Sequence, residues 1–153
     1  MGESTRILVV DDDESIRKVL SIILEEEGYA VDTAKNGKEA INKSNEKFYN
    51  LALIDIRLPD IQGIELLTKI RGTVPKMRKI IITGYPSLQN AVEALNRGAD
   101  AYVMKPFEME KVLKTIKEQL RKQQEEKVYN QEKVKEFIET RVKELEKEKK
   151  VIK

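Results

Sequence analysis

Five short runs of aliphatic or β-branched residues alternate along the chain with longer stretches in which apolar residues recur every three or four positions. The five runs occupy residues 6–10, 30–34, 51–54, 79–83 and 101–104. Several of them are apolar almost throughout, which is typical of strands that are covered on both faces of a sheet. We therefore predict five strands at these positions.

The stretches between these runs carry the periodicity of amphipathic helices. The first apolar face would end near Gly28, a residue that commonly follows a helix. The apolar positions of the five predicted helices are, in chain order, Ile16, Val19, Leu20, Ile23 and Leu24; Ala40 and Ile41; Ile64, Leu67 and Ile70; Leu88, Ala91, Val92 and Leu95; and Val112, Leu113, Ile116 and Leu120. Alternation of strand and helix predicts an α/β fold with a doubly wound parallel sheet and right-handed crossovers.

The last 33 residues, 121–153, differ in composition from the rest of the chain. Nineteen of them are charged (11 basic and 8 acidic), and none is Gly or Pro. We predict one or two exposed helices here, as a charged helical extension or linker. A narrow apolar stripe is compatible with a lone helix or with a helix that forms a homodimer, although Lys127 and Asn130 interrupt any heptad pattern.

Composition excludes several classes of function. The chain contains neither Cys nor His, so disulfides, thiol nucleophiles, zinc fingers and Ser-His-Asp triads are ruled out. Its 29 basic and 27 acidic residues nearly cancel, which gives no general attraction to nucleic acid. No apolar run is long enough to span a membrane, and the first residues resemble no signal peptide. We expect a cytoplasmic protein with no membrane partner and no direct nucleic-acid contact in this segment.

Chemically distinctive residues follow four of the five predicted strands. Asp11 and Asp12 follow the first strand, Asp55 the third, Thr83 ends the fourth, and Lys105 follows the fifth. In parallel α/β sheets, ligands bind at the carboxyl ends of the strands, beside the point where the strand order reverses. We therefore expect these side chains to meet at one edge of the sheet.

The types of these side chains favour phosphoryl transfer. Clustered carboxylates repel one another unless a cation lies between them, and oxygen ligands of this kind favour Mg²⁺. A carboxylate can also act as a nucleophile and form an acyl phosphate. Lys105 would supply a positive charge and Thr83 a hydroxyl to the phosphoryl group. The arrangement predicts phosphoryl transfer to Asp55.

The segments "ILVVDDD", "LALIDIRLPDIQGIELL" and "IIITGYPSLQNAVEALNRGADAYVMKPF" resemble the receiver domains of two-component response regulators. The resemblance covers about residues 5 to 120, and it is specific because the motifs occur together in the right order and spacing. It implies a receiver domain in residues 1–120, followed by the extension in 121–153. The fold class expected is flavodoxin-like, a five-stranded sheet of order 2-1-3-4-5 with five helices.

The resemblance also implies roles for individual residues. Asp11 and Asp12 would bind Mg²⁺ together with Asp55, the phosphoacceptor, and with the backbone carbonyl of Arg57. Thr83 would be the switch hydroxyl and Lys105 the phosphate partner, followed by a cis bond to Pro106. Tyr102 holds the place of the aromatic that turns inward on activation, whereas Asp13 is expected to cap the next helix.

The implied partners are a histidine kinase, which donates the phosphoryl group, and an output protein or an output domain missing from this chain. A phosphorelay intermediate is a further reading. Two alternatives remain: a haloacid-dehalogenase-type phosphatase with Asp11 as nucleophile, and a receiver that acts as a phosphorylation-independent scaffold. The phosphatase motif expects Thr or Val where Ser15 stands and leaves Asp55 unexplained.

Overall fold

A computed structural model describes residues 5–152, and the side chains of residues 5–149. Five strands form one parallel sheet of order β2-β1-β3-β4-β5, which confirms the predicted order. The strands are β1 (Arg6–Val10), β2 (Ala30–Ala34), β3 (Leu51–Asp55), β4 (Arg78–Thr83) and β5 (Ala101–Met104). The predicted ranges of domain and extension, 1–120 and 121–153, reach beyond the described residues at either end.

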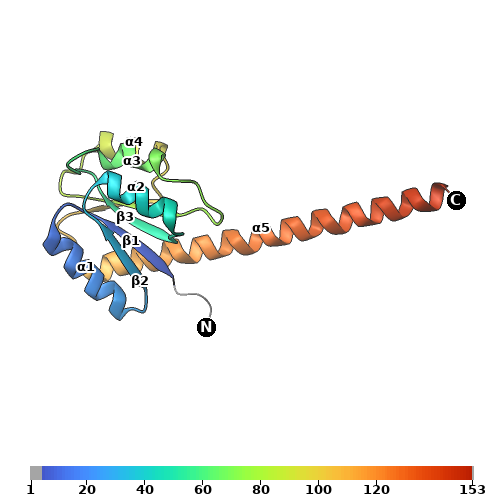
Figure 1. Cartoon of the computed structure of the whole chain (residues 1–153), viewed down its shortest axis with the longest axis horizontal. Helices are drawn as coiled ribbons and strands as arrows, with labels where there is room; N and C mark the ends of the chain where they lie inside the picture. Colours follow the sequence, from blue (N-terminus) through green and yellow to red (C-terminus); the bar gives the residue numbers. More distant parts are fainter. Residues whose placement is uncertain (1–4, 153) are drawn as a thin grey trace.

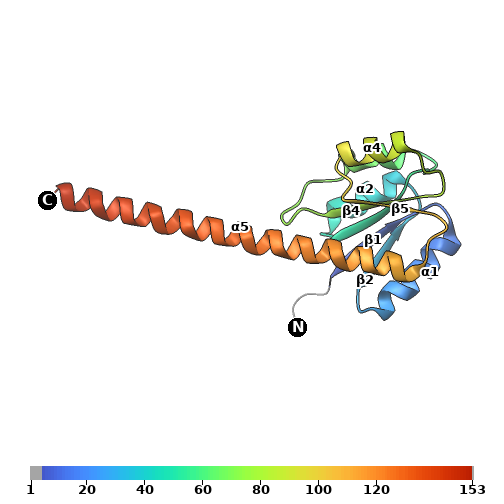
Figure 2. The ribbon, with the colours of Figure 1, turned by 180° about the vertical axis from the view of Figure 1, so that it is seen from behind.

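Five helices cover the two faces of the sheet: α1 (Glu14–Glu26), α2 (Gly37–Glu46), α3 (Gly63–Lys69), α4 (Leu88–Asn96) and α5 (Met109–Ile152). One apolar core lies between the sheet and α2, α3 and α4, and a second lies between the sheet and α1 and α5 (Figures 1 and 2). All five residues of β3 are buried, because this central strand is covered on both sides.

Local signals begin and end α1 as the sequence leads one to expect. The Asp13 carboxylate accepts hydrogen bonds from the backbone N–H groups of Ser15 (2.9 Å) and Ile16 (3.3 Å), so Asp13 caps α1 as predicted. Gly28 follows α1 with a φ of 94°, a backbone conformation that residues with a Cβ atom rarely adopt. The chain then turns directly into β2.

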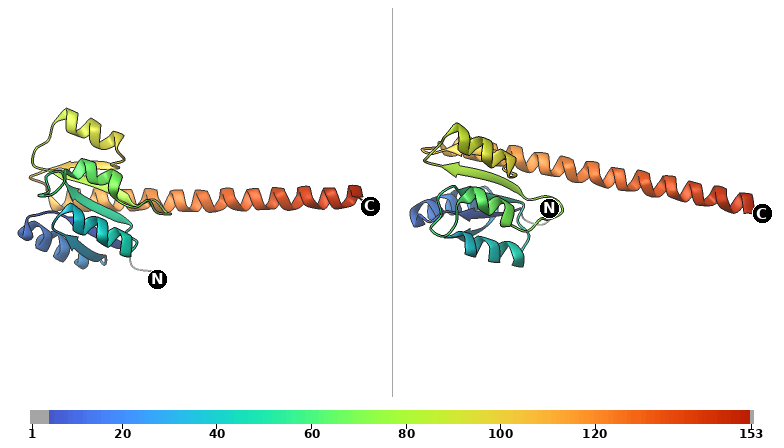
Figure 3. Two further views of the ribbon diagram at one scale, coloured as in Figure 1. Left: turned by 45° about the horizontal axis from the view of Figure 1, so that its top comes forward. Right: turned by 90° about the horizontal axis from the view of Figure 1, so that it is seen from above.

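Helix α5 is one continuous helix that runs far beyond the domain (Figures 1 and 3). Its first turns pack Val112 and Ile116 against the sheet, and the extension continues past the edge at which the strands begin. We call this the amino edge of the sheet, and the opposite one the carboxyl edge. Within residues 5–152, no helix is long and apolar enough to cross a membrane.

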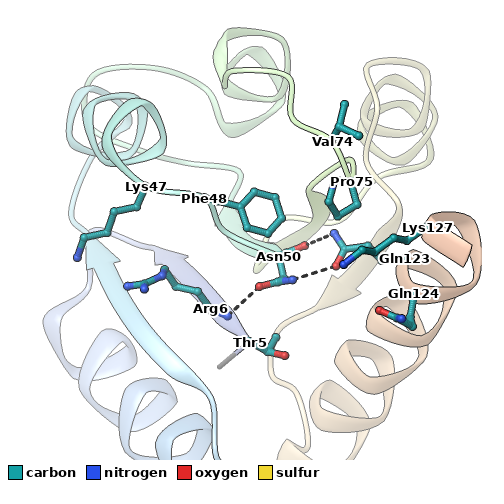
Figure 4. A pocket seen from close by; sticks show the side chains of 10 residues that line it. All are labelled: Thr5, Arg6, Lys47, Phe48, Asn50, Val74, Pro75, Gln123, Gln124 and Lys127. Atoms are coloured by element: carbon teal, nitrogen blue, oxygen red, sulfur yellow. Dashed lines mark hydrogen bonds between the residues drawn. The ribbon is translucent and has the colours of Figure 1, made fainter. Parts of the chain in front are cut away.

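Polar contacts fix α5 where it leaves the amino edge. The buried Gln123 amide donates to the carbonyl oxygens of Asn50 (2.9 Å) and Lys76 (2.8 Å), and its oxygen accepts from the Asn50 amide (3.3 Å; Figure 4). One turn later, Glu126 pairs with Arg78 at 2.5 Å. Contacts between helix and sheet thus continue to Glu126.

Candidate functional site

Three carboxylates and one ammonium group meet at the carboxyl edge of the sheet. Asp11 and Asp12 follow β1, Asp55 ends β3, and each of the three offers an oxygen within 4.8 Å of the others. The Lys105 ammonium, in the loop after β5, lies 3.1 Å from Asp11 Oδ2 and 3.5 Å from Asp55 Oδ2. Residues from three distant segments are therefore brought together, as the strand-end argument predicts.

Burial and charge make this cluster electrostatically unbalanced. Asp11 and Asp55 are buried, whereas Asp12 is exposed. Burial, followed by the charge of Asp11, raises the pKa of the Asp55 carboxyl, and the nearby Lys105 offsets only part of this effect. Burial acts to lower the pKa of Lys105, but its hydrogen bond to Asp11 and the charges of both aspartates outweigh burial and raise it. Lys105 therefore stays cationic.

The backbone around Asp55 is packed closely against the start of α3. The Gly63 N–H donates to the Ile56 carbonyl oxygen (2.7 Å). A Cβ atom at Gly63 would lie only 2.2 Å from the Asp55 carbonyl oxygen, so no larger residue fits without movement of the backbone. This glycine lets α3 begin directly beside the acidic cluster, and it thereby fixes the end of β3.

Thr83 is the last residue of β4 and is fully buried. The preceding residue, Ile82, pairs with Asp55 of β3, so Thr83 lies close to the end of β3. Its hydroxyl accepts a hydrogen bond from the Tyr85 backbone N–H (2.9 Å), and its carbonyl accepts one from the Lys105 N–H (2.6 Å). The Lys105-Pro106 bond is cis, as expected. Thr83 thus connects the loop that carries Lys105 to the strand next to Asp55.

Tyr102 lies on the edge strand β5 and packs against the core on the side of α2, α3 and α4. Its ring is partly buried, and its hydroxyl is buried without a hydrogen-bond partner among residues 5–149. A buried hydroxyl without a hydrogen-bond partner is unfavourable. The present orientation of the ring is therefore not stabilised by a hydrogen bond of its hydroxyl, and none has to be broken when the ring turns. The predicted role of Tyr102 in switching stays a prediction.

One feature of the site was missed at the sequence level. The Arg57 guanidinium lies 3.5 Å above the centroid of the Tyr85 ring, which joins the loop after β3 to the loop after β4. The Arg57 backbone N–H also donates to Asp55 Oδ1 at 3.4 Å. Nothing in the local sequence signals this pair, because the contact depends on the path of two loops. The metal-binding role of the Arg57 carbonyl stays a prediction.

The donor set fits a hard divalent cation. Asp11, Asp12 and Asp55 supply only carboxylate oxygens, and among residues 5–149 one cation, Lys105, pairs with these carboxylates. The Arg17 guanidinium lies nearby and donates to the Asp11 backbone carbonyl at 2.7 Å. Burial and the charge of Asp11 raise the pKa of Asp55, and a cation bound among the three carboxylates would counteract that repulsion. Mg²⁺ favours a few carboxylates together with water and phosphate oxygens, so these three residues would hold it.

Comparisons with known proteins agree with this geometry. Residues 7–117 match the family model described as the response regulator receiver domain. A curated relative, the uncharacterized transcriptional regulatory protein YkoG of Bacillus subtilis, is 40% identical over 119 residues. The match covers 78% of this chain and 52% of YkoG, so the chain spans about half the length of that relative.

Two solved structures are also similar to this chain. A CheY-like receiver domain protein from Methanospirillum hungatei is 49% identical, with a TM-score of 0.78 over 81% of this chain and 99% of that one. The response regulator TrrA from Thermotoga maritima, solved in complex with Mg²⁺ and a beryllium fluoride, is 38% identical, with a TM-score of 0.66 over 75% of this chain and 98% of that one.

Proposed function

The chain belongs to the family of response regulator receiver domains, and from this premise we propose that Asp55 accepts a phosphoryl group from a histidine kinase in a step that depends on Mg²⁺. The observation that carries the proposal is the convergence of Asp11, Asp12, Asp55 and Lys105 at one edge of the sheet. TrrA, a similar structure, was solved with Mg²⁺ and beryllium fluoride.

The proposed reaction is a phosphoryl transfer between two residues. A carboxylate oxygen of Asp55 forms the new bond to phosphorus, and the bond between phosphorus and the histidine nitrogen of the kinase breaks. Lys105 pairs with a phosphoryl oxygen, which costs little reorganisation because its ammonium already lies 3.5 Å from Asp55. A bound Mg²⁺ would offset the negative charge of the carboxylates and the phosphoryl oxygens.

Phosphorylation would then shift the domain between two conformations. The Thr83 hydroxyl exchanges its present contact with the Tyr85 N–H for a phosphoryl oxygen. Movement of Thr83 leaves room for Tyr102, whose hydroxyl has no hydrogen-bond partner to lose among residues 5–149. The face formed by α4, β5 and α5 changes shape as a result, and an output protein or domain reads this change.

The experiment that tests this function is phosphorylation by acetyl phosphate, followed by mass spectrometry of the intact protein and of its peptides. We expect one phosphoryl group on Asp55, none on Asp55→Asn, and none when the divalent cation is chelated. Phosphorylation at Asp11 would support the phosphatase alternative instead. Absence of label on the intact protein with ample Mg²⁺ would support the scaffold alternative and contradict our proposal.

The second part of the test concerns the donor and the output. Curated relatives of this chain are transcriptional regulators that are longer than the match. We propose that this receiver likewise acts on an output partner, and that its donor is a kinase phosphohistidine. Transfer from a phosphorylated histidine kinase to wild type but not to Asp55→Asn is the expected result.

A further inference from the structure

The extension of α5 carries an apolar stripe on the same side of the helix as the domain. Val134, Phe137 and Ile138 are 58%, 70% and 55% exposed. They lie 18 residues after Ile116, Gln119 and Leu120, the positions that pack against the domain, and 18 residues make five turns at about 3.6 residues per turn. The stripe, completed by Val142 and Leu145, thus continues the face that α5 buries against the sheet.

We propose that this stripe is the contact surface of a homodimer, in which a second copy of α5 packs against it in antiparallel orientation. An isolated helix gains little stability in water, and most helical stability in proteins comes from packing of an apolar face. The stripe (Val134, Phe137, Ile138, Val142 and Leu145) offers such a face to a partner. Two aliphatic residues lie on each side of its centre, and these four are between 45% and 58% exposed.

The position of the domain decides the orientation. Packed helices lie about 8–10 Å apart. In a parallel, in-register pair, residues 109–126 of the second copy would have to occupy the face of the first helix on which the stripe lies. The sheet of the first copy already covers that face, so the two would collide. In an antiparallel pair centred between Glu139 and Thr140, Val134 faces Leu145 of the second copy. Ile152, the last described residue of the second helix, is then level with Lys127, one residue beyond Glu126 and its contact with Arg78.

Charges beside the stripe favour the same orientation. Lys133 and Lys135 flank its first half, whereas Glu144, Glu146 and Glu148 flank its second half. An antiparallel copy brings Lys133 next to the partner's Glu144 and Glu148, and Lys135 next to its Glu146. A parallel copy would instead set lysine beside lysine and glutamate beside glutamate. Like charges in such positions destabilise a helix pair and direct the choice of partner orientation.

The contacts that Lys133 and Glu144 make within their own helix are exposed to solvent, so both side chains can exchange them for contacts with a second copy. Lys133 lies 5.5 Å from the centroid of the Tyr129 ring, and Arg141 pairs with Glu144 at 2.9 Å with both side chains more than half exposed. Arg141 also faces the stripe, so in a parallel pair it would meet its own copy. In the antiparallel pair it lies beside the partner's Ile138, which its aliphatic part can cover.

The corner between the extension and the domain has room for the part of a second helix that approaches Ile152. A hollow of about 1060 Å³ lies at the amino edge, lined on the α5 side by Gln124 and Lys127 and on the domain side by Phe48, Val74 and Pro75 (Figure 4). Gln124 and Lys127 lie five turns before Val142 and Leu145, so the hollow opens on the face that carries the stripe. Val74 is 95% exposed, and the last described turns of the second helix would lie over it.

Charge reversals test the dimer and its orientation together. The intact chain should sediment at twice its 17.7 kDa mass at high concentration. Lys133→Glu with Lys135→Glu, or Glu144→Lys with Glu146→Lys, should each raise the dissociation constant at least tenfold. All four changes in one chain should restore most of the dimerisation, because position 133 is again opposite in sign to the partner's position 144, and position 135 to its position 146; only the contact of position 133 with Glu148 stays repulsive. A parallel pair would gain nothing from these changes.

Cross-linking gives an independent readout of orientation, since the natural chain has no cysteine. Val134→Cys and Leu145→Cys chains, mixed and oxidised, should form the mixed disulfide. Within one helix the two positions lie about 16 Å apart, so neither chain should cross-link efficiently to its own kind. Disulfides between identical chains would show a parallel pair and overturn the proposed orientation.

The matched control is Lys143→Glu with Lys147→Glu, which makes the same change in charge on the opposite face of the helix. This variant should dimerise like the wild type, and circular dichroism should show equal helix content in all variants. A chain that stays at 17.7 kDa at every concentration would overturn the proposal. So would a dimer that survives both pairs of charge reversals unchanged, because it would use another surface.

Discussion

Polar side chains gather at both ends of the same sheet, but the two clusters differ in how well their charges and hydrogen bonds are satisfied. At the carboxyl edge, three carboxylates face one lysine, and the pKa of Asp55 is raised. At the amino edge, Asn50 and Gln123 satisfy each other and nearby carbonyl groups. The cluster at the carboxyl edge carries more negative than positive charge and is suited to bind a cation together with a phosphoryl group. The hydrogen bonds of Asn50 and Gln123 at the amino edge are made within the protein, and they hold α5 in place.

The largest difference should appear when one lysine is removed from each region of the sheet. Lys105→Met should slow phosphorylation of Asp55 by about a hundredfold or more, because no other cation contacts that carboxylate among the described residues. Lys79→Met is the matched control: its ammonium donates to the Leu67 carbonyl (2.9 Å), away from Asp55. The rate with acetyl phosphate should stay near wild type there, and equal losses in the two variants would contradict the comparison.

A second prediction concerns the backbone that carries the acidic cluster. Gly63→Ala should lower the free energy of unfolding by about 3 kcal/mol, because its Cβ would collide with the Asp55 carbonyl oxygen. Gly84→Ala should change it by less than about 0.5 kcal/mol, since a Cβ there lies 3.9 Å from the Lys105 side chain. Urea denaturation measures both values. A Gly63→Ala protein as stable as Gly84→Ala would show that α3 does not need this close approach.

The third prediction addresses the amino edge. Gln123→Ala should cost about 1–2 kcal/mol of stability, because two carbonyl groups lose their donor, although water from the neighbouring hollow can replace part of it. Gln124→Ala, an exposed neighbour, should cost almost nothing. Neither change should alter the rate of phosphorylation. A slower rate in Gln123→Ala would show that the two edges are coupled.

The smallest effect should come from neutralising Asp55 in the metal-free protein. The raised pKa means that the folded state holds the Asp55 proton more tightly than the unfolded state does. Stability from this group is therefore present at low pH and is lost as the pH rises through the folded pKa. Asp55→Asn should be more stable at pH 7, by on the order of 1 kcal/mol, because it removes a buried like charge.

Thermal unfolding in a chelator checks this sign. The advantage of Asp55→Asn should shrink as the pH falls below about 4, where the aspartate is protonated in both states. An Asn variant less stable than wild type at pH 7 would mean that Lys105 more than compensates the repulsion from Asp11.

The sheet could be predicted from the sequence because its three inner strands, β1, β3 and β4, are covered on both faces and are therefore mostly apolar. The third strand was expected to stop at residue 54, whereas Asp55 still pairs with Ile82 of β4. The difference arises because a charged residue ends an apolar run, although its backbone can continue the ladder. The meeting of Asp11, Asp55 and Lys105 followed from the rule that parallel strands end at one edge.

Contacts that depend on loop paths were out of reach of the sequence. The stacking of Arg57 on Tyr85 and the fit of Gly63 against Asp55 join segments whose separation along the chain carries no periodic signal. The extension was left open between one helix and two. It is one helix, because interruptions of a heptad at Lys127 and Asn130 affect packing between helices, whereas continuity requires only that no Gly or Pro intervene.

The anchoring of α5 by Gln123 and Glu126 makes the extension a lever. Its free arm, from residue 127 to residue 152, is about 39 Å long at 1.5 Å per residue. A tilt of about 5° at the anchor, caused by a shift of a fraction of an ångström within the domain, would swing the far tip by about 3 Å. In the proposed dimer, a second copy in contact with that tip would be displaced by a similar distance for as long as the helix stays straight.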